Sequence, residues 1–464
     1  MPARVLQYSD VENACDEPAR IGRLATALQQ YRDEDTVVVG TGDNTAPGVL
    51  PLVMEGRQAL EFYDAVDPDL ETFGNHDFDF GVDAAREIVR RSPQTWLSAN
   101  VRRNGGPFGS DVGVRPWTVL ERDGTRIGFT GVTTPRTVSL NPMATDIDVH
   151  DPVETARAAI DDLRDEGADY VVVCSHLGRG DDALARQVDA DVVLGGHVPS
   201  ARNEVVEGTL LTRPGDGGTA IVDLTFERDG PAATIRQTTG LEPHEDVVRS
   251  FEALQDETGL DEVIARVDEP LDRSETTLFG GEARLGNFVT DAYRWKTGAD
   301  VAIQNSGGLR TGTTLSGDVT VADVVSLVPF EEPVAVAEVS GSTLEAIFEG
   351  AAGLDLGFAE PDWWHAQVSG VILEWDPTDH SVAVDSVGGE PLDPDQRYRV
   401  ATSDYLFHTD DEFPALDPAD RVERTESSQY DVLVEYAREN GIDPAIEGRV
   451  RRLESRLESS KHTE

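Results

Sequence analysis

The sequence predicts a two-domain protein of the α/β class. Its 464 residues exceed the roughly 250–300 residues at which a single hydrophobic core stops growing. Hydrophobic residues make up 39% of the chain, which suffices for two packed cores. In the first half, short β-branched runs alternate with helical stretches, a pattern typical of sheets covered by helices.

The first domain is predicted to occupy residues 1–240. Its helices are expected at residues 21–31, 81–91 and 152–166. The last of these is preceded by Asp151, a residue type that caps helices by accepting hydrogen bonds from free backbone N–H groups. Residues 210–237 are expected to form strands that close the domain.

A linker and a second domain are predicted to follow. The linker, residues 241–268, contains a helical stretch at 245–267 with apolar residues on one face. The second domain covers residues 269–455, and a polar tail covers residues 456–464. Within the second domain we expect a segment at 278–296, a helix near 342–350, and strands at 301–304, 370–375 and 398–402.

The turn Gly-Asn-His-Asp-Phe-Asp-Phe-Gly at residues 74–81 follows a short apolar strand. A hard divalent cation takes oxygen and imidazole ligands, and the Asn75 amide supplies an oxygen without adding negative charge opposite a phosphate. His76 would then be free for proton transfer. The alternative is a polar turn in which Asn75 and Asp77 only cap backbone groups.

Four other strand-like runs also end at polar, ligand-type residues. Loops at strand ends are where α/β proteins build functional sites. A lone histidine at a strand end is more often structural, but five such ends in one chain favour a shared metal site. These residues are Asp10 and Glu12, Asp43, His176 and His197.

The motifs Asp-x-Glu, Gly-Asp-Asn, Gly-Asn-His-Asp, Ser-His-Leu-Gly and Gly-Gly-His, in this order, resemble those of calcineurin-like metallophosphoesterases, and among them the 5′-nucleotidase family. Residues 282–292 and 304–310 resemble segments of that family's C-terminal domain. The resemblance spans about residues 4–452. It implies a four-layer αββα sandwich followed by a smaller α/β substrate-binding domain.

The resemblance also implies two divalent metal ions and their ligands. Asp10 and Glu12 would bind the first ion, Asp43 would bridge both, and Asn75, His176 and His197 would complete the second. His76 resembles the family's catalytic histidine, and Asp79 would orient and charge it. Asp77 ranks lower, because it sits on the opposite side of the short turn.

Two positions depart from the family's ligand set. Position 12 is usually histidine but is Glu12 here, and Pro199 replaces a further ligand expected two residues after His197. The first ion would keep Asp10, Glu12 and Asp43, an all-oxygen set that favours Mn²⁺ or Mg²⁺ over Zn²⁺. A single-metal enzyme and loss of activity stay open as alternatives.

Substrate-binding residues are expected in the second domain. Arg310 is the first candidate for a phosphate-binding cation and Arg284 the second, with surface ion pairing as the alternative for both. Phe330 and Phe413 would sandwich a base, or else belong to the core.

The glycine-rich segment at 304–310 would also contribute to substrate binding. Asn305 would hydrogen-bond ribose or phosphate. Gly307 and Gly308 would let the backbone approach the substrate closely.

Charge restricts the partners. The chain has 88 acidic and 39 basic residues, a formal net charge of -49, so nucleic acid and anionic membranes are poor partners. Such a charge suits a halophilic cytoplasm, because the screening length falls to about 3 Å at ~1 M salt. Disorder is the alternative, but the sustained strand and helix patterns oppose it.

Sequence features also bear on location. No apolar leader precedes the first strand, and no run approaches the ~20 apolar residues of a membrane span, so we expect a cytoplasmic protein. Cys15 and Cys174 show no zinc or disulfide spacing. The sequence leaves the oligomeric state open.

Together these features predict a metal-dependent phosphoric monoester hydrolase that removes phosphate from nucleotides. A related phosphoesterase acting on cyclic nucleotides, nucleotide sugars or diphosphates is the first alternative. A nucleotide-binding protein with a degraded metal site is the second.

Overall fold

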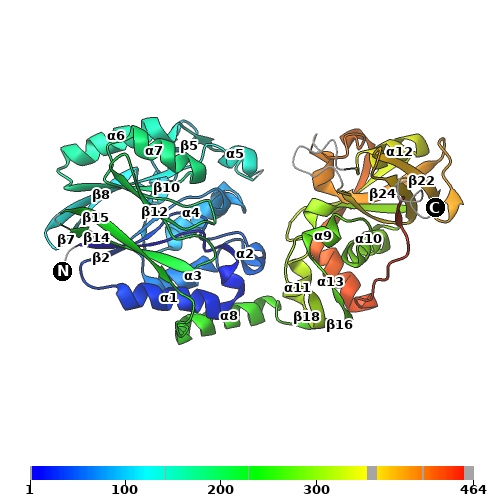
Figure 1. Ribbon diagram of the computed structural model, residues 1–464, viewed down its shortest axis with the longest axis horizontal. Helices are drawn as coiled ribbons and strands as arrows, with labels where there is room; N and C mark the ends of the chain where they lie inside the picture. Colours follow the sequence, from blue (N-terminus) through cyan, green and yellow to red (C-terminus); the bar gives the residue numbers. More distant parts are fainter. Residues whose placement is uncertain (1–2, 142, 228, 353–362, 410–411, 454–464) are drawn as a thin grey trace, which may run out of the picture. The chain divides into compact units, whose positions relative to one another are not determined.

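The computed structural model describes residues 3–141, 143–227, 229–352, 363–409 and 412–453 (Figure 1). The predicted tail at residues 456–464 lies outside the described residues. The chain divides into two compact units, Met1–Thr258 and Gly259–Glu464. No helix within the described ranges is long and apolar enough to span a membrane.

The first unit is built on two six-stranded sheets. One has the order β15 (Gly230–Gln237), β14 (Ala220–Glu227), β1 (Arg4–Tyr8), β2 (Thr36–Gly40), β3 (Leu70–Thr72), β4 (Thr95–Leu97). The other has the order β12 (Arg202–Val206), β13 (Thr209–Arg213), β11 (Val192–Leu194), β10 (Tyr170–His176), β8 (Thr125–Thr133), β7 (Trp117–Arg122). A small sheet joins β6 (Gly106–Pro107), β5 (Val101–Arg103) and β9 (Asp148–Val149).

These two large sheets pack face to face, with helices outside them (Figure 1). Val39 and Leu70 of one sheet share a buried core with Phe129 and Val172 of the other. Helices α1 (Pro18–Tyr31), α3 (Ala59–Val66) and α8 (Glu245–Thr258) pack together on the first sheet, and α6 (Pro152–Asp165) and α7 (Asp181–Gln187) cover the second. The predicted four-layer αββα sandwich is confirmed.

Helix α6 begins as its sequence indicates. The Asp151 side chain accepts hydrogen bonds from the backbone N–H groups of Val153 and Glu154, both at 2.9 Å. The remaining helices of the unit are short or peripheral: α2 (Val49–Met54), α4 (Val82–Arg91) and α5 (Thr137–Leu140).

The predicted helical stretch at residues 245–267 is too long. Helix α8 ends at Thr258, where Gly259 adopts a left-handed φ of 69° that glycine tolerates and that ends a helix. The apolar residues beyond it form strand β16 (Val263–Leu271), which pairs with β18 (Leu315–Thr320). The pairing of β16 with β18 therefore overrides the helical pattern of the sequence in the second half of this stretch.

The second unit contains a five-stranded and a four-stranded sheet. The first has the order β20 (Ala366–Ser369), β17 (Val301–Asn305), β24 (Arg397–Ser403), β19 (Pro333–Ser340), β25 (Arg421–Ser428). The second has the order β23 (Glu390–Pro391), β22 (Ser381–Val387), β21 (Val371–Asp376), β26 (Val450–Arg452). The helices are α9 (Glu275–Leu278), α10 (Arg284–Thr297), α11 (Val321–Val325), α12 (Gly341–Glu349) and α13 (Gln429–Asn440).

Strand register in the five-stranded sheet brings three loops to one edge. Strands β17 and β24 are parallel, with Ala302 opposite Ala401, so both end at this edge. Strand β19 is antiparallel to β24, with Val334 opposite Ser403, so it begins there. The segments after residue 305, after residue 403 and before residue 333 therefore meet.

Candidate active site

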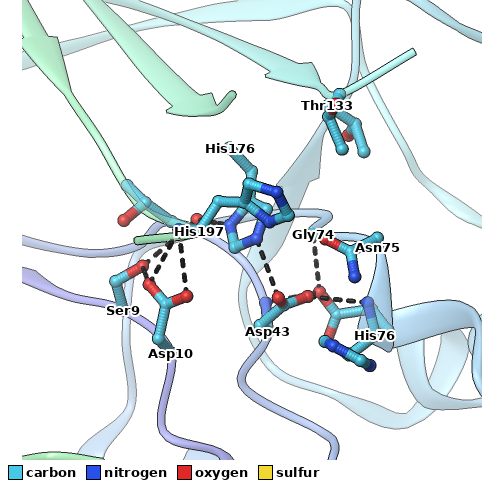
Figure 2. A network of polar contacts seen from close by, with 12 residues as sticks. Ser9, Asp10, Asp43, Gly74, Asn75, His76, Thr133, His176 and His197 are labelled. Carbon is cyan, nitrogen blue, oxygen red and sulfur yellow. Dashed lines mark hydrogen bonds and ion pairs between the residues drawn. The ribbon is translucent and has the colours of Figure 1, made fainter. Parts of the chain in front are cut away.

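The polar strand ends of the first unit converge as predicted for a shared site (Figure 2). The loops after β1 and β2 bond to each other, because the backbone N–H of Asp10 donates to Gly42 O at 3.0 Å and that of Glu12 to Asp43 O at 3.3 Å. Asp10, Glu12, Asp43 and His197 all adopt left-handed backbone conformations, with φ of 48°, 47°, 54° and 71°. These turns direct ligand-type side chains to one place.

Two groups of side chains there have the composition of metal sites. The ligand atoms of Asp43, His176 and His197 lie within 4.8 Å of one another, and so do those of Asp10, Glu12 and Asp43. Asp43 belongs to both groups. The Asn75 Oδ1 atom is buried and, among the described residues, accepts no hydrogen bond. Asn75 directly precedes His76, whose backbone N–H donates to Asp43 Oδ1 at 2.7 Å (Figure 2). An orphaned amide oxygen next to these groups fits a divalent cation.

Electrostatics in the first group also favour a cation. Burial, with the charge of neighbouring Asp10 and Asp43, raises the pKa of Glu12 to about 8. Burial likewise raises the pKa of Asp10 to about 7, although His176 and hydrogen bonds from Ser9 and His197 oppose the shift. Buried carboxylates this close repel one another, and a divalent ion between them removes that cost.

His176 is oriented for the second group. Its Nδ1 atom donates to Thr41 O at 2.7 Å, which leaves Nε2 2.8 Å from Asp43 Oδ2. Burial alone would lower the pKa of His176, but the charge of Asp43 and the hydrogen bond to it raise that pKa to about 10. The residues present fit two divalent ions that share Asp43.

His76 and Asp79 form a pair next to these groups. His76 Nδ1 lies 2.9 Å from Asp79 Oδ2, and the His76 side chain is 39% exposed. Burial would lower the pKa of His76, but Asp79, Asp43 and Glu12 raise it to about 9. Asn141 fixes Asp79 by donating to its Oδ1 at 2.7 Å. Asp79 and Asn141 therefore hold the His76 imidazole in one orientation.

Two further residues support the site, and the sequence analysis considered only one of them. Asp77 accepts hydrogen bonds from the backbone N–H groups of Asp43 at 2.9 Å and Gly74 at 2.7 Å, so it shapes the turn, in line with its lower rank. Asn141 also donates to Asn75 O at 3.1 Å, yet nothing in the sequence pointed to it. Only the tertiary fold brings it there.

In the second unit, Arg310 and Phe330 lie together. The Arg310 guanidinium sits 4.8 Å from the centre of the half-buried Phe330 ring, at the sheet edge described above. Arg273 donates to Arg310 O at 3.0 and 3.1 Å and to Ser326 O at 2.8 Å, which fixes the loop that carries Arg310. An exposed cation over an aromatic face suits an anionic ligand with a planar group.

The glycine-rich segment follows β17. Asn305 Nδ2 donates to Glu412 Oε2 at 2.8 Å. A Cβ atom on Gly308 would lie 2.2 Å from Gln304 Nε2 and 2.5 Å from Asn305 Oδ1, so a larger residue would displace these two side chains, whereas one on Gly307 would only touch the His365 ring at 3.4 Å. The open side of Gly307 is where the backbone can approach a ligand.

The prediction that Phe413 stacks on a base is wrong for this structure. Its side chain is 1% exposed and belongs to the core of the second unit, where its ring stacks on His365 with centroids 5.8 Å apart. A ring enclosed in this way offers no face to a base.

Arg284 also has a structural role in place of the predicted substrate contact. Its guanidinium donates to the backbone oxygens of Pro444 at 2.7 Å, Glu269 at 3.2 Å and Pro270 at 3.3 Å. These bonds tie the start of α10 to two other segments.

Sequence reasoning missed a carboxylate at the same sheet edge. Glu412 accepts hydrogen bonds from Asn305 and from Tyr405 Oη, the latter at 3.1 Å, and pairs with His365. Burial would raise the pKa of Glu412, but the hydrogen bond and charge of His365 lower it. Tyr405 is 41% exposed. The position of Glu412 directly before Phe413 was the only signal in the sequence.

Two family models match the chain. Residues 3–201 match the calcineurin-like phosphoesterases, and residues 263–418 match the 5′-nucleotidase C-terminal domain. The chain therefore combines a calcineurin-like phosphoesterase domain with a 5′-nucleotidase C-terminal domain. Both domain families are hydrolases.

Individual relatives are distant. The trifunctional nucleotide phosphoesterase protein YfkN of Bacillus subtilis is 25% identical over 97% of this chain, and the cell wall protein Lmo0130 of Listeria monocytogenes is 28% identical over 84%. This chain spans only 35% and 58% of their respective lengths. The crystal structure of a 5′-nucleotidase precursor from Thermus thermophilus has a TM-score of 0.71 at 23% identity, covering 98% of this chain and 100% of that one. That similarity shows the two-domain fold.

In the candidate site, Pro199 stands where the family resemblance implies a further ligand after His197. A buried ion pair holds this loop instead. Arg213 Nη2 lies 2.9 Å from Asp181 Oδ2 and donates to Gly178 O at 3.1 Å, while its Nη1 donates to Ser200 O at 3.4 Å. Arg213 thus ties the loop after His197 to the loop after His176.

Glu12 provides a test of the altered ligand set. Glu12→Gln keeps the size and an oxygen but removes a charge, so we expect one of two Mn²⁺ ions to bind at least about tenfold more weakly while the other stays bound. Wild-type protein should prefer Mn²⁺ or Mg²⁺ to Zn²⁺. Mass-spectrometric metal analysis with activity assays measures both effects. A single ion in the wild type, unchanged in Glu12→Gln, would contradict the two-ion site.

Proposed function

We propose that this metallophosphoesterase hydrolyses phosphoric monoesters of nucleosides, releasing phosphate by attack of water. The observation that carries the proposal is the shared position of Asp43 between two ligand groups. Two cations, when held by these groups, would suit in-line displacement at phosphorus, because together they would stabilise the attacking oxygen and the phosphoryl group. The proposed ions are Mn²⁺ or Mg²⁺, with Zn²⁺ less suited to the oxygen-rich first group.

Divalent ions, when bound, would polarise the phosphate and lower the pKa of a water molecule. The protein's own residues do the rest. Asp10, Glu12 and Asp43 would hold the first ion, and Asp43, Asn75, His176 and His197 the second. Positively charged His76, held by Asp79, would donate a hydrogen bond to a phosphoryl or leaving oxygen as negative charge develops there.

Recognition of the nucleoside is proposed for the second unit. Phe330 offers an aromatic face and Arg310 a cation directly above it. Asn305 and Glu412 place an amide and a carboxylate at the same edge, groups that match the hydroxyls of ribose. YfkN, a nucleotide phosphoesterase by name, is one of the relatives and supports a nucleotide substrate.

Phe330→Ala tests this assignment. With Mn²⁺, wild-type protein should release phosphate from nucleoside monophosphates and from p-nitrophenyl phosphate, and EDTA should stop both. Phe330→Ala should raise KM for the nucleotide roughly 5- to 100-fold, since base stacking contributes about 1–3 kcal/mol, and should barely change turnover of the aryl phosphate.

Phe413→Ala is the matched aromatic control. Because Phe413 is buried, its loss should destabilise the second unit by about 3–5 kcal/mol and affect both substrates alike. Equal effects of Phe330→Ala on both substrates would remove Phe330 from base recognition. Release from cyclic nucleotides, nucleotide sugars or diphosphates alone would favour a related phosphoesterase, and nucleotide binding without any release would indicate a binding protein.

A further inference from the structure

We propose that Arg136 binds the phosphate of the substrate on the first unit. The inference rests on the proposed function and extends it by assigning a cation beside the metal groups, which neither the sequence motifs nor the family ligands include. Arg136 precedes the short helix α5 and belongs to the segment between strand β8 and Asn141.

The segment that carries Arg136 is anchored to the site at both ends. On one side, Thr133 pairs with His176 in the register of β8 and β10, and the backbone N–H of Thr134 donates to His176 O at 3.1 Å. On the other side, Asn141 donates to Asn75 O at 3.1 Å and to Asp79 Oδ1 at 2.7 Å. Residues 135–140 therefore run from the second ligand group to the His76–Asp79 pair.

The guanidinium of Arg136 lies near the second ligand group. It is close enough to the His197 side chain for their charges to interact, in agreement with the anchoring of its segment. Its positive charge adds to those of the proposed ions.

The guanidinium is also available. Within the ranges that the structure describes, the Arg136 side chain is exposed and makes no hydrogen bond or ion pair; only its backbone N–H and C=O are bonded, to Thr134 and Ser139. Several other arginines of this unit are paired with carboxylates, such as Arg103 with Asp83 at 2.8 Å and Arg86 with Asp111 at 2.7 Å. In a chain of net charge -49, a cation without a carboxylate partner at an acidic site stands out.

The chemistry of an arginine suits a phosphate. Its planar fork of N–H donors matches two phosphate oxygens, and it stays charged at every working pH. Next to a site that would hold two cations, it cannot pair with the ligand carboxylates without competing with those ions. A dianionic phosphoryl group would be attracted by Arg136 and by the proposed cations at the same time.

The test compares Arg136→Gln with Arg136→Lys and with Arg91→Gln. Arg91, in the last turn of α4, is likewise exposed and without a side-chain partner in the described part of the chain, so its replacement makes the same charge change elsewhere. Calorimetry with inorganic phosphate on Mn²⁺-loaded protein measures binding. Assays with a nucleoside monophosphate and p-nitrophenyl phosphate measure kcat/KM.

Arg136→Gln should weaken phosphate binding at least about tenfold and lower kcat/KM for both substrates roughly 10- to 100-fold, at unchanged Mn²⁺ content. Arg136→Lys should recover part of the loss, and Arg91→Gln should match wild type. The inference is overturned if Arg136→Gln behaves as Arg91→Gln does, if Mn²⁺ is lost in parallel, or if only the nucleotide is affected. An inactive wild type would refute the proposed function, whereas phosphate binding would still report on Arg136.

Discussion

Asp43→Asn is expected to abolish phosphate release, lowering kcat at least about a thousandfold for nucleotide and aryl phosphate alike. The reason is that both ligand groups depend on the Asp43 carboxylate. The amide keeps the shape of the side chain but removes the charge that two cations would share. Metal content, measured by mass spectrometry, should fall for both ions, in contrast to Glu12→Gln.

Asp16→Asn is a suitable control for this variant. Asp16 is a carboxylate of the same unit that accepts hydrogen bonds from the backbone N–H groups of Val49 at 2.9 Å and Leu50 at 2.7 Å, and it belongs to neither ligand group. Its replacement should leave metal content unchanged. If Asp43→Asn keeps both ions and its activity, Asp43 is no bridging ligand.

Salt is expected to have the second largest effect. With a net charge of -49, the acidic side chains of the folded chain repel one another at low ionic strength. Added salt screens these charges and shortens the range of the repulsion. We expect Tm to rise by about 10 °C or more between about 0.2 and about 2 M KCl, and folded structure to be lost well below that range. Melts followed by far-UV circular dichroism measure the change.

Sucrose separates screening from general stabilisation, because it is excluded from protein surfaces but carries no charge. It should raise Tm much less than KCl does. A melting curve that is flat across the KCl series would refute the halophilic interpretation.

The sequence was most informative where chemistry and local structure coincide. His176 and His197 could be assigned because each ends a β-branched run, and parallel strands that end together bring such residues to one place. The alternation of strands and helices predicted an α/β domain, whereas the four αββα layers were implied by the resemblance to calcineurin-like metallophosphoesterases. Asp151 could be identified as a cap because capping involves only the next three residues.

Other residues depended on tertiary contacts. Phe413 has the same local pattern whether it packs in the core or faces a base, and only its enclosure against His365 decides the matter. Arg284 was misassigned because the carbonyls that it binds lie in other segments, among them Pro444. Asn141 and Arg136 reach the site through a loop whose course no periodicity describes.

The left-handed backbone of Asp10, Glu12, Asp43 and His197 affects how this site would decay in evolution. Asparagine and aspartate enter that conformation readily, while most other L-residues lose about 1–2 kcal/mol there. A lineage that lost its metal chemistry could thus exchange Asp10 or Asp43 for asparagine and keep its fold, whereas alanine would weaken the loops as well. A relative with asparagine at these positions is expected to keep the fold but to lack catalytic activity.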